Sequence, residues 1–221
     1  MKKLLTTFFL LSCIVISVKA QDASGSDDQK FHFGLKATPT LCWLRVDAEG
    51  VKNDGIRIGF TYGLTTEFRI AKNYAFATGV DVSYRGGKYR VDLGSLGELK
   101  VTQRLQYLDV PIALKLKTNE IGYIKYYGSF GFLPGVLIKA NQDVDSPNTS
   151  LIPNSSKRSN QSDFSAFNMG LVVGGGLEYN VGGSTSFTAG LVYNNGFIDI
   201  WDMKDAQMNT DYITLNLGIL F

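Results

Sequence analysis

The ten residues Tyr212–Phe221, with the sequence YITLNLGILF, decide the fold class of this 221-residue chain. Apolar side chains occupy every second position from Ile213 to Phe221, whereas the alternate positions from Tyr212 to Gly218 carry tyrosine, threonine, asparagine and glycine. A period of two is that of a β-strand with one apolar and one polar face. A chain that ends on such a strand, at an aromatic residue, is typical of a membrane barrel, whose last strand closes the sheet and turns its apolar face to lipid.

The other end of the sequence predicts export. The first 20 residues start with basic side chains, continue as a mostly apolar run and finish in a small-residue cleavage site, which is typical of a secretory signal removed after Ala20. Lipid attachment at Cys13 is an alternative that the sequence leaves open. The expected domains are a secretory signal over 1–20, a short linker over 21–30 and an outer-membrane barrel over 31–221.

Composition limits the classes of protein to consider. The chain has 22 basic and 20 acidic residues, a balance that argues against a dedicated nucleic-acid binder. Outside the predicted signal, no apolar run approaches the length of a membrane-spanning helix. If the protein lies in a membrane, it must therefore do so as a barrel.

The pattern of strands and connections predicts the topology. Candidate strands cover approximately 31–46, 56–70, 74–92, 100–117, 123–140, 164–180, 185–200 and 210–221. Short connections at 71–73, 118–122 and 181–184 alternate with longer polar ones at 47–55, 93–99, 141–163 and 201–209. This alternation predicts an eight-stranded antiparallel up-and-down transmembrane β-barrel with short periplasmic turns and longer external loops.

Charged residues avoid the apolar parity of these strands. In the third candidate strand Val80 and Val82 share one parity, whereas Asp81 and Arg85 have the other. An eight-stranded barrel is just wide enough for its interior to be filled by side chains, and charges placed there must pair. We therefore expect a structural polar plug, with a proton or ion path as the alternative. The predicted plug comprises Lys36, Glu67, Arg69, Asp81, Arg85, Asp109, Lys115, Lys125 and Glu178.

Two prolines lie within candidate strands. Pro111 and Pro134 interrupt otherwise regular strand patterns, although proline is disfavoured in a central strand. We expect each of them to mark a β-bulge.

The sequence offers little material for catalysis. His32 is the only histidine, and Cys42 is the only cysteine after the predicted signal, so neither a Ser-His-Asp set nor a zinc site can be assembled. We expect His32 to be a solvated or interfacial ring near the periplasmic rim and Cys42 to be a small apolar filler. No catalytic, cofactor-binding or metal-binding residue is therefore predicted, and the protein is not expected to be an enzyme.

Three segments carry a family resemblance. The opening FHFGLK at 31–36, the hairpin FRIAKNYAFATG at 68–79 and the strand LQYLDVPIALK at 105–115 resemble the PorT family of outer-membrane β-barrel proteins. The Tyr-Leu-acid-aliphatic-Pro pattern at 107–111 is the most specific of the three, whereas 37–43 departs from the family's usual continuation. The resemblance implies an outer-membrane barrel, and, because the family's namesake is linked to a protein-secretion system, an accessory role in secretion.

These observations favour a small integral outer-membrane barrel with a non-enzymatic structural, surface-binding or secretion-accessory role. A narrow diffusion channel and a soluble, secreted lipocalin-like barrel are the alternatives. The expected partners are outer-membrane lipid and the barrel-insertion machinery, for which Phe221 is the predicted assembly signal. Secretion-system or surface partners are expected at the external loops, and no nucleic acid is expected.

Overall fold

A computed structural model of the chain describes residues 30–94, 97–146, 154–202 and 206–221. The predicted signal over 1–20 and lipid attachment at Cys13 lie outside the described residues. Across the described ranges, no helix has the length and apolar character needed to cross a membrane.

The described chain consists almost entirely of antiparallel strands. They are β1 (Phe31–Asp47), β2 (Val51–Gly55), β3 (Arg57–Ala71), β4 (Tyr74–Asp92), β5 (Glu98–Asp109), β6 (Ile112–Lys117), β7 (Ile124–Asp145), β8 (Ser155–Ser159), β9 (Phe167–Gly182), β10 (Thr185–Gly196) and β11 (Gln207–Leu220), with a 3-10 turn, η2 (Gln161–Asp163), before β9.

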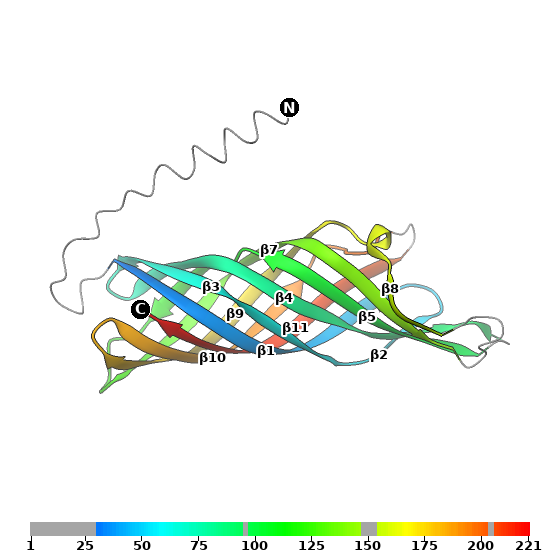
Figure 1. Cartoon of the computed structure of the whole chain (residues 1–221). Coiled ribbons are helices and arrows are strands. Elements are labelled where there is room, and N and C mark those ends of the chain that lie inside the picture. Colours follow the sequence, from blue (N-terminus) through cyan, green and yellow to red (C-terminus); the bar gives the residue numbers. More distant parts are fainter. Residues whose placement is uncertain (1–29, 95–96, 147–153, 203–205) are drawn as a thin grey trace, which may run out of the picture.

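The strands close into a ring. β1 pairs with β3 on one side and with β11 on the other, and β4, β5 with β6, β7, β9 and β10 complete the circuit. Since β5 and β6 occupy one place between β4 and β7, the ring has eight strand positions, which confirms the predicted topology. In Figure 1, β1 begins and β11 ends at the same end of the barrel as the short β3–β4 and β9–β10 turns.

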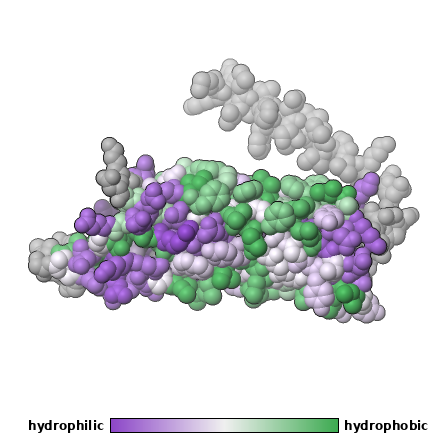
Figure 2. All heavy atoms as spheres, turned by 180° about the vertical axis from the view of Figure 1, so that it is seen from behind, coloured by the Kyte–Doolittle hydropathy of each residue, from purple (hydrophilic) through white to green (hydrophobic). Residues whose placement is uncertain are grey.

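An apolar band surrounds the barrel. Exposed apolar side chains run along β3 from Ile58 to Ile70 and along β7 from Tyr126 to Ile138. Each run covers roughly 40 Å of strand, or about 30 Å of membrane thickness at the usual strand tilt. Figure 2 shows apolar surface over this part of the barrel and polar surface toward both ends. The predicted outward parity is therefore the one that the fold adopts.

The expectation of proline bulges is wrong. The pairing of Asp109 with Gly135 and of Ile112 with Phe132 leaves equal numbers of residues between them on the two strands, so no residue is inserted. Pro111 instead separates β5 from β6, and the carbonyl of Pro134 accepts a hydrogen bond of 2.9 Å from the Val110 N–H across this interruption. The break between β5 and β6 accommodates Pro111, which has no backbone N–H to donate to a neighbouring strand.

The external ends of some strands extend beyond their predicted limits. β7 continues to Asp145, five residues past the candidate boundary, because β8 provides it with a partner where β9 has not yet begun. Part of the predicted external loop at 141–163 is therefore β-sheet. β2 similarly continues the wall along β4 beyond β3, so the barrel wall projects past the apolar band.

Candidate functional site

Four charged residues form a compact cluster inside the periplasmic half of the barrel. Lys115 Nζ lies 2.6 Å from a Glu67 oxygen and 2.5 Å from a Glu178 oxygen, and Lys117 Nζ lies 2.5 and 2.9 Å from the other oxygens of the same carboxylates. Lys115 also lies over the Tyr127 ring at 3.9 Å. Inward-facing positions of β3, β6 and β9 thus place two cations and two anions in alternation, so that each buried carboxylate contacts two ammonium groups.

A second ion pair depends on a missing side chain. Lys36 of β1 and Asp81 of β4 are separated by β3, where Gly63 pairs with both of them. Their charged groups are 2.7 Å apart, and a Cβ at Gly63 would come within 2.3 Å of an Asp81 oxygen. Glycine therefore permits two inward side chains on non-adjacent strands to meet over the inner face of β3.

A third site holds an arginine that is completely enclosed by the barrel. The Arg85 guanidinium lies 3.2 Å from Asp109, donates to the Tyr212 hydroxyl at 3.0 Å and stacks on the Tyr107 ring at 4.0 Å. The Ser83 hydroxyl donates to the second Asp109 oxygen at 2.5 Å. The buried charges are thus both paired and hydrogen-bonded, as burial requires.

The three ionic sites line a small internal cavity. This cavity has a volume of about 140 Å³, and its walls include Lys36, Asp81, Asp109 and Lys115 together with threonine and asparagine side chains. Ligand pockets are usually larger than about 300 Å³. The cavity is therefore smaller than a typical site for a drug-sized ligand. The Lys115 cluster separates it from a wider opening at the periplasmic end.

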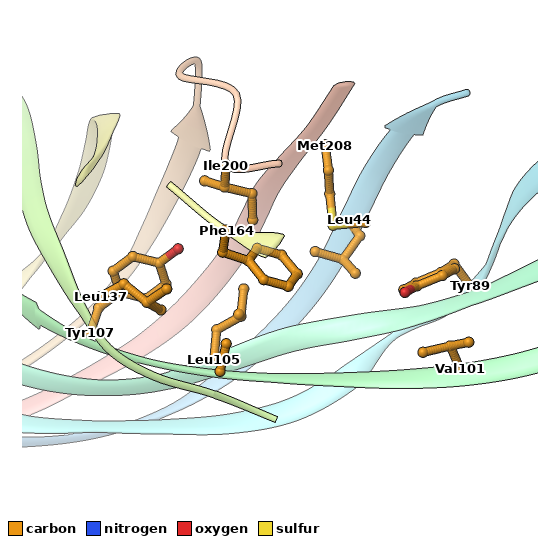
Figure 3. Close-up of a cluster of buried hydrophobic side chains, with 10 residues drawn as sticks. Leu44, Tyr89, Val101, Leu105, Tyr107, Leu137, Phe164, Ile200 and Met208 are labelled. Atoms are coloured by element: carbon orange, nitrogen blue, oxygen red, sulfur yellow. The ribbon is translucent and has the colours of Figure 1, made fainter. Parts of the chain in front are cut away.

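An apolar cluster fills the lumen on the external side. Leu44, Leu105, Ile200 and Met208 are each no more than 2% exposed, and Figure 3 shows them converging with Phe164. The cluster draws on β1, β4, β5, β7, β11 and the connections before β9 and after β10. The lumen is therefore occupied by two successive layers, one ionic and one apolar. The full set is Leu44, Tyr89, Val101, Leu105, Tyr107, Leu137, Ala140, Phe164, Ile200 and Met208.

The structure distributes the predicted plug residues unequally. The members with less than a tenth of their surface exposed are Glu67, Asp81, Arg85, Asp109, Lys115 and Glu178. Lys36 is half-buried, whereas Arg69 and Lys125 line the periplasmic opening. Lys125 pairs with Glu120 of the neighbouring turn at 3.3 Å.

Several partners of the plug were not predicted as site residues. Lys117 has the inner parity of its strand and completes the periplasmic cluster. Tyr107 and Tyr212 enclose Arg85. The parity of their strands was sufficient to predict that both side chains point inward. Cys42 packs with Leu133 and Tyr212, in agreement with its expected role as a filler. Among the residues that the structure describes, no group of three or more His, Cys, Asp or Glu could hold a metal ion.

The closed ring and its outward apolar band define an integral membrane β-barrel. A profile of the outer membrane protein β-barrel domain family matches residues 19–202. The chain belongs to this family, and the outer membrane is its location.

Similar solved structures include Neisserial surface protein A, at 18% identity and a TM-score of 0.49, over 87% of this chain and 96% of that chain. Another is the outer membrane protein OprG from Pseudomonas aeruginosa, at 15% identity and a TM-score of 0.47, over 90% and 99% of the respective chains. No curated protein matches the chain.

Proposed function

We propose that the protein is a non-enzymatic, non-conducting outer-membrane barrel that presents a rigid external head at the cell surface. By external head we mean β2, β8 and the ends of β4, β5 and β7 that project past the apolar band. The observation that carries this proposal is the filling of the lumen by the apolar cluster around Leu105 and Phe164. That cluster fills the lumen from the external edge of the apolar band outward, so the projecting strands pack against a filled interior. The charges of the plug, which form mutual pairs, then serve to stabilise the fold.

The outer surface of the head is suited to polar contacts. Lys88, Arg104 and Asp143 lie in neighbouring register positions on β4, β5 and β7, and Arg104 forms an ion pair with Asp143. A charged, solvent-exposed sheet on a rigid support fits a surface-binding role better than a catalytic one.

Conductance measurements test the closed lumen. We expect the protein purified from membranes to give no stepwise current in planar lipid bilayers, because the Lys115 cluster and the apolar cluster lie in series along the lumen. A porin inserted under the same conditions is the positive control. Reproducible unitary steps would favour the diffusion-channel alternative and contradict this function.

A secretion-accessory role is the finer hypothesis, and it rests on the PorT resemblance. The residues of the specific motif have structural positions that explain their chemistry, since Tyr107 and Asp109 hold Arg85 and Pro111 ends β5. These contacts give the motif residues a structural role in the barrel interior that other proteins with the motif would share. Normal export of secreted proteins by cells that lack the gene would remove the secretion hypothesis.

The terminal aromatic residue provides a separate prediction. Phe221 is 47% exposed, and its backbone exchanges hydrogen bonds of 2.7 and 3.3 Å with Phe33 at the closing seam. We expect deletion of Phe221 to lower the amount of assembled barrel in the outer membrane, measured by heat-modifiable migration on gels. Replacement of Phe221 by tyrosine is the control that retains an aromatic terminus. Wild-type assembly of the deletion variant would exclude an assembly-signal role.

A further inference from the structure

An open hollow with a polar lining lies at the periplasmic end of the lumen. It has a volume of about 620 Å³ and is lined by residues from the periplasmic ends of β1, β3, β4, β6, β7, β9, β10 and β11 and from the turns between strands. We call it the periplasmic vestibule. Its lysine and arginine lining residues are Lys30, Arg69, Lys72, Lys117 and Lys125, and His32 also lines it.

The acidic residues of the periplasmic vestibule are fewer and already engaged. They are Glu67, Glu120 and Glu178. Lys115, from behind the vestibule floor, and Lys117 contact both Glu67 and Glu178, and Glu120 pairs with Lys125. The vestibule therefore has an excess of positive charge.

The excess charge is concentrated at the rim. Lys30 and Lys72 are exposed, and no ion pair within the described part of the chain engages either of them. A concave site with low-dielectric walls focuses the field of such charges toward its mouth. The arrangement would attract an anion that enters from the periplasm.

We propose that the periplasmic vestibule binds the carboxylate groups of an acidic peptide segment. Its several separated cations match a ligand with several separated carboxylates. A phosphate of the surrounding lipid is a poorer match, because the charged lining residues lie on the inner parity and in the turns, whereas the lipid-facing parity of the same strands is apolar.

Two sources could supply such a segment. The sequence QDASGSDDQ at 21–29 has three aspartates and no basic residue, and it joins the barrel at Lys30. Nine residues can reach roughly 30 Å when extended, and tethering gives a local concentration in the mM range. The other source is an acidic segment of a periplasmic protein.

Binding of a fluorescent probe peptide tests the site. The probe is the nonapeptide QDASGSDDQ, added to the full-length protein purified from membranes into zwitterionic micelles, with fluorescence anisotropy as the readout. We expect the double variant Lys30→Gln, Lys72→Gln to bind the probe about tenfold more weakly, because each substitution removes one attraction between a lysine and a carboxylate of the probe. The matched control is Lys52→Gln, Lys100→Gln, which removes two exposed lysines at the external end and should leave binding unchanged.

A second variant distinguishes the two sources. If the chain's own segment occupies the vestibule, replacement of Asp22, Asp27 and Asp28 by asparagine should strengthen probe binding several-fold, because the tethered competitor has lost its charges. Equal binding by this variant and the wild type assigns the site to an external acidic segment. The proposal is overturned if neither protein binds the probe, or if the Lys30→Gln, Lys72→Gln variant binds it as the wild type does.

Discussion

Replacing Lys115 by methionine is expected to lower the free energy of unfolding by about 3–5 kcal/mol, the usual cost of breaking a buried ion pair from one side. The substitution would leave Glu67 and Glu178 buried near one another with Lys117 as their remaining shared cation. Methionine fills a similar volume, so lost packing contributes little. Urea unfolding of the barrel in lipid vesicles, followed by tryptophan fluorescence, gives the measurement.

Two further variants show that the effect comes from charge. Lys100→Met, at an exposed position of β5, should change the unfolding free energy by less than about 0.5 kcal/mol. Adding Glu178→Gln to Lys115→Met should restore part of the lost stability, because one uncompensated carboxylate is then neutral. A Lys115→Met protein as stable as the wild type would show that the four-residue cluster does not hold this part of the barrel.

Replacing Phe164 by alanine is expected to cost about 3–5 kcal/mol, as is usual for a buried aromatic side chain. Phe164 comes from the connection before β9 and is 6% exposed within the external apolar cluster. Its loss would loosen the connection between β8 and β9 while leaving the membrane-embedded ring closed. We therefore expect proteases to cleave this connection faster on intact cells, and we expect the urea concentration at the unfolding midpoint to be lower than that of the wild type.

Phe167 supplies the matched control for that experiment. It lies three residues further along the chain, at the start of β9, and is 42% exposed on the outer face. Phe167→Ala should cost much less stability in micelles and leave protease cleavage at the wild-type rate. Similar behaviour of the two variants would contradict the assignment of Phe164 to a solid external head.

The sequence predicts the barrel well because its main signal is local. A period of two requires no knowledge of long-range contacts, and it places Asp81, Arg85 and Glu178 inside as soon as the apolar positions are taken as outward. The number of strands follows from the connections between them. These features account for the agreement of the ring and of the inner parity with the sequence.

The contacts within the lumen depend on strand register, which periodicity leaves undetermined. Lys36 meets Asp81 only because Gly63 lies opposite both, and the sequence has no feature that aligns these three residues. The external apolar cluster is even harder to predict from the sequence, because Phe164 and Ile200 belong to irregular connections that have no repeating pattern. The expectation of bulges at Pro111 and Pro134 failed because a break in pairing also accommodates proline.

The outward orientation of the apolar residues is the central claim, and spin-label accessibility tests it most directly. In a Cys42→Ala background, nitroxide labels would be placed one at a time at Ser129, Phe130, Phe132 and Leu133 of β7, in protein reconstituted into lipid bilayers. Phe130 and Phe132 are about half exposed, whereas Leu133 is 9% exposed and faces inward. We predict frequent collisions with dissolved oxygen at 130 and 132 and rare collisions at 129 and 133. The reverse alternation, or equal collision rates at all four positions, would contradict the account.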